Sequence, residues 1–142
     1  MRLLTYHAKR FDWQPYSKTL ESAPNVVCGG SVLECVVVWL HVEKADQDDE
    51  ARIFRHVLKH IKWIANKRNM RHVVLHSFAH LGGDTAPAPF AQAFIDRLAA
   101  RLRATNYGVH RTPFGYFCSW TLDIYGDSLA KVYKQVDALS ST

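Results

Sequence analysis

A chain of 142 residues, 48% hydrophobic and 12% aromatic, has enough apolar material for one globular core, so we predict a single domain over residues 1–142. Its formal net charge of +5 favours an anionic partner such as RNA or a phosphate-bearing substrate. An excess of this size is also common in proteins that bind neither, so charge alone does not choose a function.

Cysteine usage and hydropathy exclude several protein classes. Cys28, Cys35 and Cys118 are an odd number without a CxxC pair, which argues against a disulfide framework and against a structural zinc site. The first ten residues become charged too early for a secretory signal, and the apolar run "VVVWL" is too short to span a bilayer. We therefore predict a soluble, cytoplasmic protein that needs no metal and no cofactor.

The first half of the chain predicts two strands and a helix. Residues 2–7 are typical of a strand, and the Pro-, Ser-, Asn- and Gly-rich stretch 11–30 indicates a connection or an irregular hairpin. Residues 31–42 are almost continuously apolar and β-branched, which favours a central strand covered on both faces. Acidic residues at 48–50 then begin a helix that ends near Asn69.

The second half alternates in the same way. Residues 72–78 predict a strand, a Gly- and Pro-rich loop follows, and a helix runs from about Pro89 to Asn106. Two extended pieces broken at "PFG" come next, and residues 127–139 show the spacing of a final amphipathic helix. This order predicts an α/β fold, a mixed sheet with about three helices.

Histidines and a cysteine are the candidate reactive groups. His80 lies where a strand ends, the position at which α/β sheets collect ligand sites, so it either handles protons or bonds its own turn. His56 and His60 are four apart on a helix but lack the glutamate and third ligand of a zinc motif, which favours ordinary helix histidines. Cys118 alternates with apolar residues, which favours a buried, inert thiol over a nucleophile.

Four ordered segments carry a family resemblance. "MRLLTYH" at the start, "HVEKAD" from His41, "FAHL" from Phe78 and "PFGYF" from Pro113 resemble the N-terminal editing domain of archaeal threonyl-tRNA synthetases. The resemblance runs nearly end to end and implies a fold like that of the D-aminoacyl-tRNA deacylases. It also implies a homodimer, with threonyl-tRNA synthetase as a possible partner.

The function implied by the resemblance is hydrolysis of the ester of mischarged aminoacyl-tRNA, with seryl-tRNA for threonine first, by a free-standing domain acting in trans. The family's pocket is built largely from main-chain groups, and the terminal ribose hydroxyl assists the attacking water. Carried over by position, the predicted catalytic residues are His80 and Cys118. The predicted substrate-binding residues are Val42, Ala79, Tyr116, Phe117 and Lys131.

Three positions depart from the family pattern. The archaeal motif usually reads Pro-Phe-Gly-Tyr-Tyr-Lys, whereas this chain has Phe117 and Cys118, and a glutamate usual in the last helix is replaced by Lys131. The loss of a hydroxyl and a cation leaves three further functional hypotheses open. They are a deacylase with altered amino-acid preference, a non-catalytic module that binds aminoacyl-tRNA ends or a synthetase, and a small-molecule hydrolase on the same fold.

Overall fold

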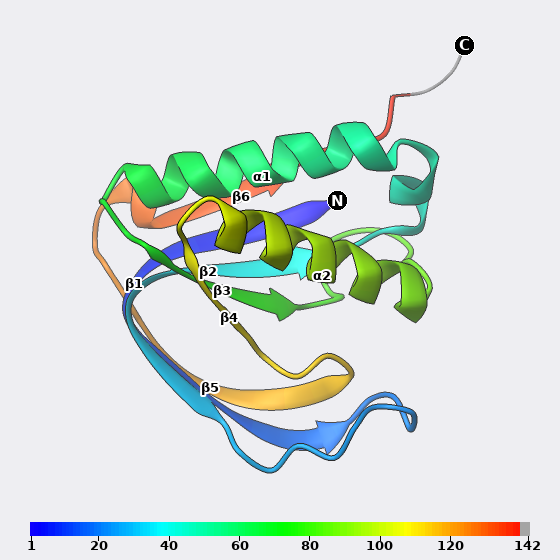
Figure 1. The fold of residues 1–142 in the computed structure, drawn as a ribbon, viewed down its shortest axis with the longest axis horizontal. Helices are drawn as coiled ribbons and strands as arrows, with labels where there is room; N and C mark the ends of the chain where they lie inside the picture. Colours follow the sequence, from blue (N-terminus) through cyan, green and yellow to red (C-terminus); the bar gives the residue numbers. More distant parts are fainter. Residues whose placement is uncertain (140–142) are drawn as a thin grey trace.

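The computed structural model describes residues 1–139, which form a six-stranded mixed sheet with two α-helices on one face (Figure 1). The strands are β1 (Arg2–Lys18), β2 (Gly30–His41), β3 (His72–Ser77), β4 (Gly108–Arg111), β5 (Tyr116–Ile124) and β6 (Lys131–Gln135). The helices are α1 (Glu50–Asn66) and α2 (Ala88–Ala104), and two short 3-10 turns are η1 (Lys44–Asp48) and η2 (Ser128–Ala130). The predicted α/β class and mixed sheet are confirmed.

Strand β1 organises the sheet because it has different partners along its length. The strand order is β4-β3-β2-β1-β5, with β1 antiparallel to β2, and with β2, β3 and β4 mutually parallel. On the other edge of β1, residues 2–6 pair with β6 and residues 8–18 pair with β5. The chain from β5 to β6 therefore follows one edge of β1, interrupted by a short loop that contains η2.

The sheet bends where β1 changes partner. The register with β5 shifts between Ala8 and Arg10, and opposite this point Glu34 of β2 has a positive φ of 49°. A bulge of this kind sharpens the twist of both strands. The hydroxyl of Tyr125, the residue after β5, donates to the Glu34 carboxylate at 2.7 Å and so links the end of β5 to the bend. Figure 1 shows the far halves of β1 and β2, together with β5, turning away from the helical layer.

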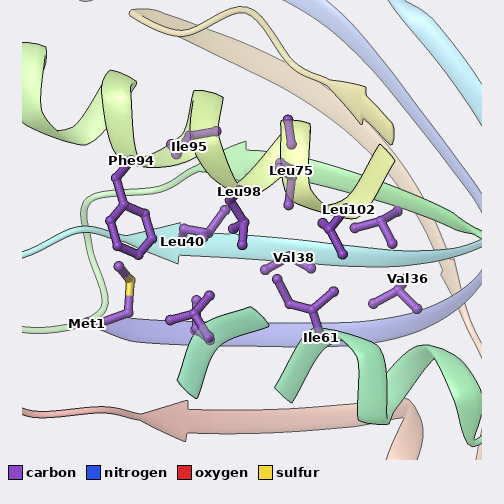
Figure 2. Close-up of a cluster of buried hydrophobic side chains, with 14 of the residues drawn as sticks. Met1, Val36, Val38, Leu40, Ile61, Leu75, Phe94, Ile95, Leu98 and Leu102 are labelled. Carbon is purple, nitrogen blue, oxygen red and sulfur yellow. The ribbon is translucent and has the colours of Figure 1, made fainter. Parts of the chain in front are cut away.

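Two cores result from this bend. The larger lies between the sheet and the helices, and Figure 2 shows Val36, Val38 and Leu40 of β2 facing Ile61 of α1 and Leu98 of α2. Side chains alternate along a strand, so the intervening residues of β2 face the opposite side of the sheet. There they form a second buried cluster with the bent halves of β1 and β2, made of Ala8, Phe11, Trp13, Val32, Cys35, Val37 and Val74.

The predicted elements differ from the structure at two places. Residues 11–30, predicted to be a connection or an irregular hairpin, do lie in an antiparallel hairpin of β1 and β2, but β1 continues as far as Lys18 within this stretch. Pro15 lies beside a second register shift, a place where a strand tolerates proline. The predicted final helix is wrong, because residues 128–130 form η2 and residues 131–135 form β6. The unpaired edge of β1 supplies backbone hydrogen-bond partners that this segment takes in preference to its own helical bonds.

Candidate functional site

The principal pocket has a volume of about 510 Å³ and lies at the ends of β2 and β3, beside the start of α2. Its opposite wall is the turn between β4 and β5 and the first half of β5. The lining residues are Thr19, Leu20, Leu40, Val42, His76, Ser77, Phe78, Ala79, His80, Thr85, Ala86, Ala88, Ala91, Pro113, Phe114, Gly115, Tyr116, Phe117, Cys118 and Trp120. A volume of this size suits a small organic ligand or the end of a larger one.

An aromatic cluster borders the pocket and connects it to the second core, against which Trp39 packs. The ring centroid of Trp120 on β5 lies 4.7 Å from that of Trp39 on β2 and 5.3 Å from that of His76 on β3. Phe78 closes the group at 5.9 Å from Trp120. Since β5 reaches β3 only because the sheet bends, this wall is a product of the tertiary fold.

His76 is the buried titratable group of the wall. Its side chain is 3% exposed and its Nδ1 lies 2.6 Å from the hydroxyl of Thr112. Burial lowers the pKa of His76 to about 4, because the charged imidazolium would lose its hydration. At neutral pH, His76 therefore presents a neutral ring to the pocket.

The loop that follows His80 is held closely against the end of β2. The backbone N–H of Gly83 donates to Glu43 at 2.7 Å, that of Lys44 donates to the Asp84 carbonyl at 2.7 Å, and that of Ala86 donates to the Val42 carbonyl at 3.0 Å. A Cβ at Gly82 would lie 2.8 Å from both Glu43 and the Arg2 side chain, so this close approach requires glycine.

Glu43 is an electrostatic anchor for the same loop. Its carboxylate accepts from the Met1 amine and from the Arg2 guanidinium, each at 2.8 Å, in addition to Gly83. Burial alone would raise the pKa of Glu43, but hydrogen bonds from the Met1 amine and Gly83 outweigh it and lower that pKa. The carboxylate is thus ionised and fully engaged behind the pocket loop.

All but one of the predicted site residues line the pocket, from both of its walls: Val42, Ala79, His80, Tyr116, Phe117 and Cys118. Lys131 does not. It opens β6, pairs in register with Tyr6, is exposed, and is not among the lining residues. The structure therefore separates Lys131 from the residues with which sequence reasoning had grouped it.

The structure gives Tyr116 and Cys118 specific roles in the pocket wall. The Tyr116 hydroxyl donates to the Pro24 carbonyl at 2.8 Å and accepts from the Val26 N–H at 2.9 Å, so it fastens the loop after β1. Burial raises the pKa of the Cys118 thiol, which disfavours the thiolate that a nucleophile requires. These observations leave Tyr116 contributing its ring and Cys118 a neutral thiol to the pocket wall.

The polarity of the pocket limits its chemistry. Within residues 1–139 its wall contains no Asp, Glu, Lys or Arg, and its polar side chains are histidines, hydroxyls and one thiol. Across the same residues, no group of three or more His, Cys, Asp or Glu side chains is placed to hold a metal ion. Such a pocket can orient a polar ligand and a water molecule, and it can offer hydrogen-bond donors.

No helix in the described part of the chain is long and apolar enough to cross a membrane.

Sequence reasoning missed several lining residues, notably His76, Thr85 and Trp120. His76 stands in the same segment as His80, four residues earlier, but strand alternation alone cannot tell which face of β3 will border a cavity. Trp120 alternates along β5 with Cys118 and Leu122, which pack against the second core, and its ring contacts Trp39. No sequence pattern indicated that this face would meet β3 and the loop.

The fold and site together define the class: this is a domain with the D-aminoacyl-tRNA deacylase-like fold. A solved structure described as "c-Myc DNA Unwinding Element Binding Protein" is similar in fold, with a TM-score of 0.61 and 15% sequence identity over 97% of this chain and 100% of that chain. Residues 1–136 match the archaea-specific editing domain of threonyl-tRNA synthetase. The chain belongs to this family, and the resemblance found in the sequence is confirmed.

Curated relatives agree with this assignment. The chain is 31% identical over 140 residues to the "Threonine--tRNA ligase" of Staphylothermus marinus and 24% identical over 136 residues to that of Methanococcus aeolicus. Each match covers 96% of this chain and 22% of the relative. The chain thus spans about a fifth of the length of these ligases.

Proposed function

We propose that this domain hydrolyses the ester of mischarged aminoacyl-tRNA, with seryl-tRNA for threonine as the first candidate substrate. Water attacks the acyl carbon, the bond from that carbon to the ribose oxygen breaks, and the amino acid and the free tRNA leave. The observation that carries the proposal is the neutral pocket at the strand ends, which the family segments "FAHL" and "PFGYF" line from opposite sides.

The absence of charged side chains from the described pocket wall supports a mechanism in which the substrate contributes a group of its own. An aminoacyl ester is already activated, so a placed water and donors to the developing oxyanion supply most of what the reaction needs. In this mechanism the neighbouring ribose hydroxyl assists the water. His80, exposed at the pocket mouth, places the water or the ribose, whereas Cys118 acts as a neutral wall.

Substrate discrimination in this proposal depends on shape. Serine and threonine differ by one methyl group, and attraction to one methyl is worth only about 1–3 kcal/mol, so threonine must be rejected sterically. Phe117, 57% exposed, and Cys118 border the region where the family has a hydroxyl and a cation. These changes favour an alternative form of the proposal, in which the deacylase prefers a less polar amino acid than serine.

Ester loss from a panel of charged tRNAs tests the activity. The purified protein is incubated with seryl- and threonyl-tRNA for threonine, and with other mischarged and D-aminoacyl-tRNAs. We expect seryl-tRNA, or one other member of the panel, to decay faster than in buffer while threonyl-tRNA persists. Decay at the buffer rate for every member would refute the deacylase proposal.

Removal of the terminal ribose hydroxyl should abolish turnover, and persistent turnover would refute RNA assistance.

His80→Ala tests the proposed catalytic residue. We expect hydrolysis to slow by about 10- to 100-fold, because misplacing a reactant by about 1 Å can cost that much, with no change in the thermal midpoint. His56→Ala is the matched control, since His56 is exposed on α1 and away from the pocket. Unchanged turnover in His80→Ala would return His80 to a turn-stabilising role.

A binding module is the second candidate, and the neutral Phe117 and Cys118 favour it. Its signature is binding of aminoacyl-tRNA, or of a threonyl-tRNA synthetase, without ester loss.

In either role the protein acts in the cytoplasm, where tRNA is charged. A homodimer remains a proposal from the family, which sedimentation measures directly.

A further inference from the structure

His41, the last residue of β2, joins two points of the pocket loop. Its side chain is 1% exposed, and its Nδ1 lies 3.2 Å from the backbone nitrogen of Leu81, which donates to it. Its Nε2 lies 3.0 Å from the Thr85 hydroxyl oxygen. Leu81 and Thr85 are the two sides of the loop, so one imidazole ring spans it.

These contacts determine where the imidazole proton lies. A backbone N–H can only donate, so Nδ1 of His41 must carry a lone pair. The ring is then neutral with its hydrogen on Nε2, and this hydrogen is donated to the Thr85 oxygen. Burial supports the neutral form by lowering the pKa of His41. Among the surrounding charged groups, Glu43 and Asp46 oppose that shift, whereas the Met1 amine and Arg2 favour it.

The same reasoning assigns the hydrogen of Thr85. Its oxygen is already an acceptor from His41, so its own O–H hydrogen remains available to an acceptor elsewhere. Within residues 1–139, the Thr85 hydroxyl makes no hydrogen bond other than that to His41. Thr85 is exposed and lines the pocket, so this hydrogen can be donated to solvent in the free protein and to an acceptor of a ligand that occupies the pocket.

We propose that the Thr85 hydroxyl is a hydrogen-bond donor to an acceptor oxygen of the ligand, and that His41 is the residue that positions it. The identity of the ligand as an aminoacyl ester rests on the proposed function. In that setting the acceptor is the ester carbonyl oxygen, which becomes more negative as water attacks. A donor held by a buried ring needs little reorganisation when that charge develops.

Binding of a non-hydrolysable probe tests the donor. The probe is a seryl-adenosine analogue whose ester is replaced by an amide, titrated by calorimetry into the full chain. We expect Thr85→Val, which keeps the shape and removes the hydroxyl, to weaken binding about 3- to 10-fold, the range of a single hydrogen bond. Thr85→Ser should bind within about twofold of the wild type. Thr121→Val, the same change at an exposed position of β5 outside the pocket, is the control.

His41 is tested by its coupling to Thr85. We expect His41→Leu to weaken binding to a similar extent and the double variant to be no weaker than either single variant, because both remove one contact. His41→Gln, whose amide can still donate to Thr85, should recover part of the affinity. Binding by the wild type should fall as acid protonates His41, and Thr85→Val should lack most of this pH dependence.

Nitrogen-15 chemical shifts of His41 test the tautomer without any ligand. A protonated Nε2 and an unprotonated Nδ1 are expected, and the opposite tautomer would overturn the inference. Equal binding by Thr85→Val and wild type would also overturn it, while leaving the proposed function intact. Failure of the wild type to bind the probe would overturn the ligand assignment together with the aminoacyl-ester function.

Discussion

Among the three cysteines, environment rather than residue type sets reactivity. Burial raises the pKa of Cys35 to about 12, and it also raises the pKa of Cys118, whereas Cys28 is exposed. The thiolate is the reacting species, so the buried Cys35 and the half-buried Cys118 are both expected to react slowly at neutral pH. This is the physical reason for assigning Cys118 to the pocket wall instead of to the chemistry.

Alkylation rates test this ordering. With iodoacetamide at pH 7, we expect Cys28 to react first, Cys118 at least about tenfold more slowly, and Cys35 only on unfolding, because access decreases in that order and burial raises the pKa of the Cys118 and Cys35 thiols. Peptide mass spectrometry over a time course gives the three rates. Cys118 reacting as fast as Cys28 would mean that its thiol is activated after all.

At the scale of elements, the bent half of the sheet depends on a close contact between two strands. Gly30 opens β2 directly opposite Trp13 of β1, and a Cβ built on Gly30 would lie 2.4 Å from two carbons of the Trp13 ring. Trp13 is 8% exposed and belongs to the second core. The glycine therefore leaves room for the Trp13 indole against the neighbouring strand.

Gly30→Ala should lower the free energy of unfolding by about 1–3 kcal/mol, because the methyl group forces the buried indole to move. Gly126→Ala is the matched control, since a Cβ there meets nothing within 4 Å, and we expect its effect to stay within about 0.5 kcal/mol. Urea unfolding followed by tryptophan fluorescence measures both. A Gly30→Ala variant as stable as the control would show that this packing is loose.

The whole molecule has buried histidines in both of its layers, and they link stability to pH. His60 of α1 lies 3.3 Å from the Thr5 hydroxyl under the helices, and His76 lines the pocket on the other face. Burial lowers the pKa of each to about 4, with Lys134 contributing at His60. An unfolded histidine binds its proton near pH 6.5, so between pH 6.5 and 4 the unfolded chain holds more protons than the folded one.

We therefore expect the free energy of unfolding to be highest near neutral pH and to fall as pH drops through this window. From pH 7 to pH 5 each histidine should account for about 1–2 kcal/mol of the loss. His60→Gln should reduce the loss relative to His56→Gln, an exposed control on the same helix. Urea titrations at both pH values give the difference, and equal losses in the two variants would contradict the assignment to His60.

Strong local patterns were enough to predict part of this architecture. Continuous β-branched character identified β2, and helical spacing with acidic residues at the start identified α1. The final segment shows the limit, because Leu129, Val132 and Val136 have helical spacing yet lie in or beside β6. Pairing with β1 is a non-local interaction, and a hydrophobic pattern read along one segment contains no information about which edge is vacant.

The candidate site, too, could be predicted from the sequence only in part. The segments "FAHL" and "PFGYF" located both walls of the pocket, because they are local features that carry the family resemblance. Sequence did not place Lys131 away from the pocket, Trp120 against His76, or Thr85 within reach of His41. Each of these facts depends on a non-local feature: the pairing of β6 with β1, the bend at Glu34, or the path of a loop across the end of β2.

The sequence by itself determined the family, the α/β class and the region of the pocket, because all three follow from short segments whose residue types can be interpreted without knowledge of their tertiary contacts. Only the tertiary structure decided the charge and protonation of that pocket. Burial lowers the pKa of His41 and of His76 and raises that of the Cys118 thiol, so it favours the neutral form of each, and burial depends on what the bent sheet and the loop bring together around a residue.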